Sequence, residues 1–147
     1  MSTPSNIDLF NEYTGRTFAH LYEHFPIEKS IPIRLIVGSD VLHEETANGA
    51  MKPTKECEIA FGTVKWLHET GYITATPHPY ESFSNAVLTA KGLELLKLTP
   101  DALKSSIGDR LIDACKKGAS ESLVKLSSTA LTSGLGMAFH AAMTTLS

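Results

Sequence analysis

The stretch around Gly71 constrains the fold most, because a helix end and a strand start are signalled side by side. Over residues 57–70 apolar side chains recur at helical spacing, which predicts a helix. Gly71 follows where a residue in the left-handed conformation ends many helices. Residues 72–75, Tyr-Ile-Thr-Ala, then have the composition of a strand. We therefore expect the chain to change from helix to strand across one glycine.

The residues that follow predict a hairpin and a further helix. Pro77, Pro79, Glu81 and Ser82 form a turn-rich tip, and residues 83–88 supply a returning strand. Thr89 is a good cap for a helix over residues 90–98. The segment 57–98 thus predicts a helix, a hairpin and a second helix in immediate succession.

The N-terminal part of the chain predicts a long helix. Ser5 and Asp8 form the pattern of a capping box, so a helix should begin there, and Pro26 should stop it. Its apolar stripe recurs at spacings of three and four and consists of Ile7, Phe10, Thr14, Phe18, Leu21 and Phe25. We expect this stripe to face the core.

Between these helices we expect a short strand, a short helix and a loop. Residues 31–37 are β-rich, and Gly38, Ser39 and Asp40 have the composition of a turn and helix cap. Residues 48–54 contain Asn, Gly and Pro with little periodicity, which predicts an exposed loop.

This order of elements resembles the winged helix-turn-helix superfamily. The resemblance covers residues 5–98 and is strongest over residues 61–96, through the motifs WLHETGYI and LTAKGLELL. It implies that residues 5–25 are the first helix and that residues 31–35 are the first strand. It also implies that residues 57–70 are the recognition helix and that the hairpin is the wing. Most winged-helix domains bind DNA, so the resemblance makes DNA a candidate partner.

The charges on the presumed recognition face disagree with that expectation. Lys65 is the main cation of the helix, against Glu58 and Glu69, and the wing tip TPHPYESFS contains no Lys or Arg. Affinity for DNA depends on neutralising phosphates, and the formal net charge of the chain is -3. We therefore favour a protein-interaction or adaptor module, with a DNA-binding transcriptional regulator as the alternative.

Both hypotheses use the same surface. The candidate contacts to DNA or to a partner, from the recognition helix and the wing, are Glu58, Thr63, Lys65, His68, His78, Tyr80 and Phe83. The regulator would rely on Lys65, Thr63, His68 and the wing near His78. Trp66 occupies a helical core position and should be at least partly packed, whereas Tyr80 and Phe83 should be exposed on the wing.

One short motif suggests a metalloenzyme. His20, Glu23 and His24 spell H-x-x-E-H, which supplies two zinc ligands and a base in one class of proteases. The two histidines lie away from the apolar stripe, so we expect them to face solvent, and no third ligand is at a persuasive position. We expect no enzyme activity, no metal and no cofactor.

The C-terminal residues 99–147 predict a helical extension. Thr99, Pro100 and Asp101 form a helix start, and Gly118 should end that helix after a basic last turn. After Lys125 no acidic or strongly basic residue follows. That uncharged run has three explanations: it packs on its own domain, it pairs between subunits, or it enters a membrane.

We favour the first two explanations, because Ser and Thr are frequent and small residues recur every four positions. The candidate oligomerisation residues are Leu131, Gly134, Leu135, Ala138, Phe139 and Ala142. A homodimer is therefore an expected assembly, and no membrane partner is expected.

Taken together, the sequence predicts an α+β, mostly helical protein with a winged-helix domain over residues 5–98 and a helical extension over residues 99–147. The N-terminus has no basic cluster followed by an apolar run, so a cytoplasmic location is expected. Cys57 and Cys115 are not in a metal or redox spacing and should be small buried side chains.

Overall fold

The computed structural model describes residues 4–99 and 105–146, with side chains up to residue 133. The fold is α+β and mostly helical, which confirms the expected class. In chain order the elements are α1 (Asn6–His24), β1 (Lys29–Pro32), α2 (Ile33–Val37), β2 (His43–Glu45), β3 (Met51–Pro53), α3 (Lys55–Glu69), β4 (Ile73–His78), β5 (Ser82–Leu88), α4 (Ala90–Lys97), α5 (Ile107–Lys117) and α6 (Ser120–Leu146).

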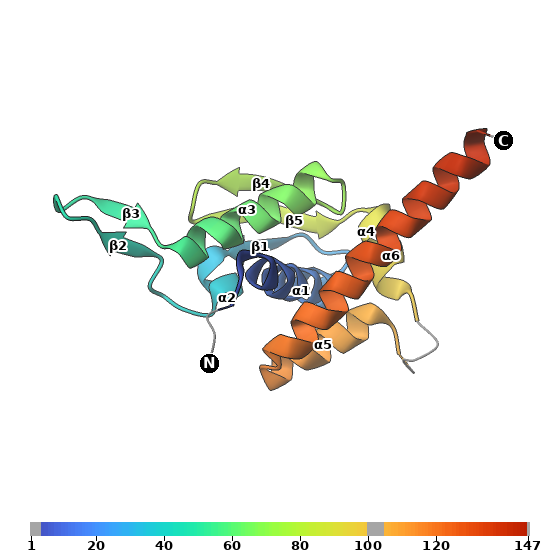
Figure 1. Ribbon diagram of the computed structural model, residues 1–147, viewed down its shortest axis with the longest axis horizontal. Coiled ribbons are helices and arrows are strands. Elements are labelled where there is room, and N and C mark those ends of the chain that lie inside the picture. The colour runs from blue at the N-terminus through green and yellow to red at the C-terminus, as the bar shows by residue number, and fades with distance from the viewer. Residues whose placement is uncertain (1–3, 100–104, 147) are drawn as a thin grey trace.

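Helix α1 is the centre of the molecule, packed against α3, α5 and α6 (Figure 1). The predicted capping box is confirmed, because the Asp8 N–H donates to Ser5 Oγ at 3.1 Å and the Ser5 N–H donates to the Asp8 carboxylate at 3.4 Å. Phe18 and Leu21 are buried as expected. The ends of the predicted stripe are not, since Ile7 is 68% exposed and Phe25 is 37% exposed. Burial instead extends around α1 because helices cover it on several sides.

The predicted change from helix to strand at Gly71 is confirmed. Gly71 has a φ of 86° and follows α3, and β4 and β5 form an antiparallel hairpin. Strand β1 pairs with β5, so the sheet order is β1-β5-β4. Thr89 caps α4, because its Oγ1 accepts the N–H of Gly92 at 3.2 Å.

The segment between β1 and α3 differs from the expectation in three ways. The strand ends at Pro32, and Ile33–Val37 is the helix α2, although these residues are β-rich. Proline lacks an N–H for the sheet and presets the φ angle that a helix start needs. Gly38, with a φ of 78°, ends α2 and does not introduce a later helix. The expected loop at residues 48–54 is part of a second hairpin, β2–β3, which extends away from the body (Figure 1).

The two C-terminal helices share one core with the rest of the chain. Helix α5 begins at Ile107, where Ser106 Oγ accepts the N–H of Asp109 at 3.2 Å. We expected this helix to start near Thr99, but Thr99 and residues 105 and 106 are not helical. Residues 100–104 lie outside the described part. Gly118, with a φ of 64°, ends α5 as expected.

Helix α6 has two parts with different surroundings. Its first half packs on α1 and α5, where Leu123, Ser127 and Ala130 are fully buried. Its C-terminal end projects beyond the body (Figure 1). Within the described chain, none of the helices combines the length and apolar composition needed to cross a bilayer.

Candidate functional site

Helix α3 presents one long face to solvent, and the sequence determines which face. Thr54 Oγ1 accepts the N–H of Cys57 at 3.1 Å and so fixes the start of the helix. The residues that turn to the core recur at helical spacing and are Cys57, Ala60, Thr63, Val64 and Leu67. The opposite face consists of Lys55, Glu58, Gly62, Lys65, Trp66 and Glu69, all of which are exposed.

The charges on this face are largely self-neutralised. Lys65 Nζ lies 3.8 Å from Glu69 Oε1, one turn further along the helix. Over its whole length α3 carries two lysines and three glutamates, a net charge of −1. An exposed pair of this kind adds little to stability, but it places a carboxylate beside the ammonium that would otherwise meet a phosphate. The face therefore has no excess of positive charge.

Gly62 leaves an open notch in the middle of the same face. Apart from the neighbouring residues and the backbone of α3 itself, a Cβ built at this position would have no described atom within 4 Å. A glycine in a helix interior costs about 1 kcal/mol of stability relative to alanine. At Gly62 no close approach within the described chain offsets that cost.

Trp66 borders the notch and is partly packed, as expected. Its ring lies 5.3 Å from Phe10 in an edge-on arrangement and 6.2 Å from Tyr72 in a stacked one. Lys91 Nζ sits 4.3 Å from the centre of the Tyr72 ring, on the same aromatic group. The indole is nevertheless 39% exposed, so part of its surface is open to another molecule.

The wing tip lies against the first half of α3. Tyr80 has a φ of 59°, its ring lies 5.1 Å from Phe61, and its carbonyl accepts the thiol hydrogen of Cys57 at 3.4 Å. Tyr80 is 41% exposed, which confirms its expected exposure. His78 is also exposed and hydrogen-bonds Ser84 through Nε2 at 3.0 Å. The tip therefore offers aromatic and neutral polar groups beside α3.

The structure separates the predicted contact residues into two groups. Exposed side chains belong to Glu58, Lys65, His68, His78 and Tyr80. Thr63 and Phe83 are buried, at 2% and 1% exposure, so the expectation of a surface role is wrong for both. Thr63 Oγ1 donates to the carbonyl of Ile59 at 2.7 Å, and Phe83 stacks on Phe61 at 5.0 Å. Both side chains serve packing.

The two histidines of the H-x-x-E-H motif are half-buried, so the expectation that they face solvent is wrong. His20 Nε2 donates to the carbonyl of Ser30 at 3.0 Å, and His24 Nδ1 donates to the carbonyl of His20 at 2.8 Å. Burial lowers the pKa of His20, outweighing the Ser30 hydrogen bond. Among the residues that the structure describes, no three His, Cys, Asp or Glu side chains gather as metal ligands.

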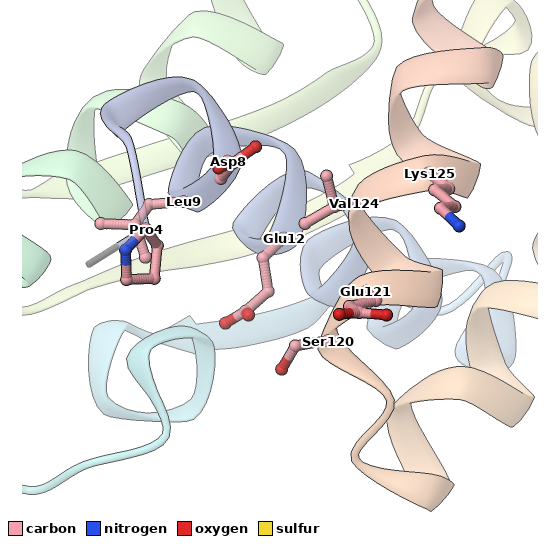
Figure 2. A pocket seen from close by; sticks show the side chains of 8 residues that line it. All are labelled: Pro4, Asp8, Leu9, Glu12, Ser120, Glu121, Val124 and Lys125. Carbon is pink, nitrogen blue, oxygen red and sulfur yellow. The ribbon is translucent and has the colours of Figure 1, made fainter. Parts of the chain in front are cut away.

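A groove of about 500 Å³ lies between the first turns of α1 and α6. Figure 2 shows Leu9 and Glu12 on one side, Val124 turned toward them from α6, and Lys125 turned away. This groove could not be predicted from the sequence, because it arises where two helices far apart in the chain cross. Its acidic side chains are partly engaged, since Glu12 pairs with Arg16 at 3.4 Å. It lacks the convergent set of polar groups that orients a small ligand.

The candidate oligomerisation residues all belong to α6. Leu131 is buried, at 8% exposure, in the half of the helix that packs on the body. The remaining candidates, whose side chains lie outside the described part, are Gly134, Leu135, Ala138, Phe139 and Ala142. Leu131 is thus largely occupied within its own chain.

Comparisons with protein family models, with curated proteins and with solved structures gave no match to this chain. The exposed face of α3, with the wing tip beside it, is the surface where exposed aromatic rings, carboxylates and an unfilled position occur together. We take it as the candidate site.

Proposed function

We propose that this protein is a non-enzymatic winged-helix interaction module that docks a protein partner through α3 and the wing and self-associates through α6. The element order α1-β1-α2-α3-β4-β5 and the sheet order β1-β5-β4 support the winged-helix assignment. In that arrangement α3 takes the place of the recognition helix and β4–β5 the place of the wing. The β2–β3 hairpin is an insertion between α2 and α3 that the resemblance did not include.

The pairing of Lys65 with Glu69 is the observation that carries the protein-docking role. DNA affinity comes largely from cations that neutralise phosphates, and a carboxylate within 3.8 Å of the cation opposes that. The wing tip supplies Tyr80 and two prolines but no cation. Exposed aromatic rings are instead enriched in protein-binding surfaces.

The self-association is supported by the shape and sequence of α6. The helix has 27 residues, and its C-terminal end projects past the body (Figure 1). No Asp, Glu, Lys or Arg follows Lys125, so this end lacks the charges that keep a solvated helix apart from its copies. Pairing of two such helices would give a symmetric dimer.

A DNA-binding regulator is the alternative, because the winged-helix order of elements favours it. Lys52, Lys55 and Lys65 all lie on β3 or α3 and would be the phosphate contacts, although Lys52 already pairs with Glu44 at 3.5 Å. A dimer would present this set twice.

Titration of the protein into labelled random duplex DNA, at low and then moderate salt, separates the two roles. The docking module should leave the fluorescence anisotropy of the DNA unchanged even at low salt. A salt-dependent rise that Lys65→Ala lowers, and that Lys97→Ala at an exposed position of α4 does not, would establish the regulator and overturn the proposal.

A further inference from the structure

Another groove, of about 400 Å³, runs between α5 and the first turns of α6. Its charged lining consists of three cations, Arg110, Lys117 and Lys125, against one carboxylate, Asp113, which is a net charge of +2. The chain as a whole carries a formal charge of -3, so positive charge is concentrated at this place. Helices α3 and α5 pack on different sides of α1, which separates the α5–α6 groove from the candidate site (Figure 1).

Two of these cations are not neutralised by carboxylates of the described chain. Lys117 Nζ lies 3.0 Å from Asp113 Oδ2, but the ion pairs among the described residues include neither Arg110 nor Lys125. Lys125 also borders the α1–α6 groove, and Figure 2 shows its side chain turned away from that groove. Arg110 is half-buried, so packing limits the movement of its side chain. The groove therefore offers a restrained guanidinium and an exposed ammonium to an anion.

The surroundings of the groove favour an acidic protein segment over a nucleic acid. Asp113 lies in the groove, and the exposed Asp109 and Glu121 are the sequence neighbours of two lining residues, Arg110 and Ser122. A duplex presents a continuous row of phosphates and would meet these carboxylates together with the cations. A short peptide can place one or two carboxylates on the cations alone. The groove is also lined by Leu126, which offers apolar contact that a phosphate backbone does not use.

We propose that an acidic segment of a partner protein binds in the α5–α6 groove, with its carboxylates paired to Arg110 and Lys125 and a neighbouring apolar side chain against Leu126. A guanidinium binds a carboxylate through two parallel N–H···O bonds, and an ammonium adds a contact that adapts its direction. The opposite charges of segment and groove make the two surfaces complementary. This is a second docking surface, so the inference goes beyond the role proposed for α3 and does not depend on it.

Labelled peptides test this inference on the full chain. The acidic probe is a Gly/Ser peptide with several glutamates around one leucine. Its matched probes replace the glutamates by glutamines, or by lysines, or replace only the leucine by serine. Fluorescence anisotropy at low and then moderate salt gives the affinities, with random duplex DNA as a further probe. The variants are Lys125→Glu, at an exposed position, and Arg110→Gln, and thermal unfolding checks that each variant folds.

We expect the wild-type protein to bind the glutamate peptide in a salt-dependent way and to leave the glutamine peptide, the lysine peptide and DNA unbound. Replacing the leucine by serine should weaken binding about two- to fivefold. Arg110→Gln should weaken it at least about threefold. Lys125→Glu should weaken it at least about tenfold, because it puts a like charge against the peptide.

Lys97→Glu is the matched control, because it makes the same change of charge at an exposed position of α4 that does not line the groove. It should leave peptide binding close to that of the wild type. Absence of glutamate-peptide binding, or equal weakening by Lys97→Glu and Lys125→Glu, would overturn the inference. So would DNA binding that Lys125→Glu removes, because the groove would then be a phosphate site. None of these results changes the role proposed for α3, which Lys65→Ala tests separately.

Discussion

Gly15 of α1 and Ser127 of α6 lie so close that a Cβ on Gly15 would be 2.6 Å from the serine Oγ. The same Cβ would be 3.1 Å from Leu123, also on α6. The absence of a side chain at Gly15 therefore lets α6 lie directly on the central helix. This contact sets the direction in which the C-terminal half of α6 leaves the body.

Gly15→Ala should destabilise the protein by about 1–3 kcal/mol, because the added methyl overpacks a closed contact. The Ser127 hydroxyl is buried and has no hydrogen-bond partner among the described residues, so Ser127→Ala alone should be close to neutral. In the Ser127→Ala background the cost of Gly15→Ala should fall by at least about 0.5 kcal/mol. Urea unfolding of the two single variants and the double variant measures this coupling. Equal costs in both backgrounds would contradict the contact.

Two helical glycines should respond to alanine in opposite directions. At Gly92 the new Cβ would lie 2.2 Å from the backbone oxygen of Tyr72, which cannot move independently of the hairpin. Gly92→Ala should therefore lower the unfolding free energy by about 1–3 kcal/mol. Gly62→Ala should raise it by up to about 1 kcal/mol. Thermal and urea unfolding of the pair check the signs, and a loss of stability on Gly62→Ala would show an internal role for that glycine.

The half-buried His20 should make the protein sensitive to mild acid. Burial lowers the pKa of His20 in the folded state, with His24 and Lys29 acting in the same direction and Glu23 opposing them. The unfolded chain therefore takes up the proton first. The stability from neutral His20 is complete above its unfolded pKa of about 6.5 and is lost as the pH falls toward the lower folded value.

The corresponding measurement is the melting temperature of the wild type and of His20→Gln from about pH 8 down to about pH 5. The wild type should lose stability below about pH 6.5, and the variant should show a shallower decline. His43→Gln, which changes an exposed histidine on β2, is the control and should follow the wild type. Parallel curves for all three proteins would exclude His20 as the titrating group.

The two cysteines should differ in reactivity toward a neutral thiol reagent. Cys57 is fully buried and donates to the Tyr80 carbonyl, whereas Cys115 is half-buried. Burial raises the pKa of both thiols, which keeps them protonated and slow to react at neutral pH. We expect Cys115 to be labelled first and Cys57 only on unfolding, as followed by mass spectrometry of wild type and Cys115→Ser. Rapid labelling of Cys57 in the native state would mean that the wing tip opens from α3.

The sequence predicted best those elements whose signals are local. Gly71 and Thr89 mark a helix end and a helix start by their own conformational and hydrogen-bonding properties, so the order α3, hairpin, α4 could be predicted from them. The short helix α2 could not. Its β-branched residues suit a strand, but Pro32 ends the sheet pairing, and Ile33 and Ile36 become fully buried on one helical face.

The exposure of the predicted contact residues was correct for some of them and wrong for Thr63 and Phe83. Phe83 was expected on the surface of the wing, but β5 contains an irregularity near Asn85, whose φ is 54°, and the strand buries Phe83 and Ala86. Simple alternation along the strand does not reproduce that pattern. The open space beside Gly62 could not be predicted, because it depends on which segments of the chain pack against α3. The α1–α6 groove forms where the two helices cross, and their close contact at Gly15 could not be predicted from the residues around that glycine.

A charge placed in the projecting half of α6 should separate the subunits of the proposed dimer. Leu135→Glu and Ala138→Glu each put a carboxylate into a run that has no charged residue after Lys125. If that run pairs between copies, each carboxylate would be buried without a partner, which disfavours association strongly. Sedimentation equilibrium should show a wild-type dimer and monomeric variants. At high dilution, where the wild type also dissociates, the melting temperatures of the wild type and the variants should be similar.

Ser128→Glu is the matched control, because Ser128 is exposed in the half of α6 that packs on the body, and a carboxylate there should leave the dimer intact. Dissociation by Ser128→Glu but not by Leu135→Glu would move the interface from the projecting end to the body. A wild-type chain that sediments as a monomer at every concentration would remove self-association from the proposed function. It would leave the projecting end of α6 to bind a different protein, because an uncharged helix of this length is poorly suited to stand alone in water.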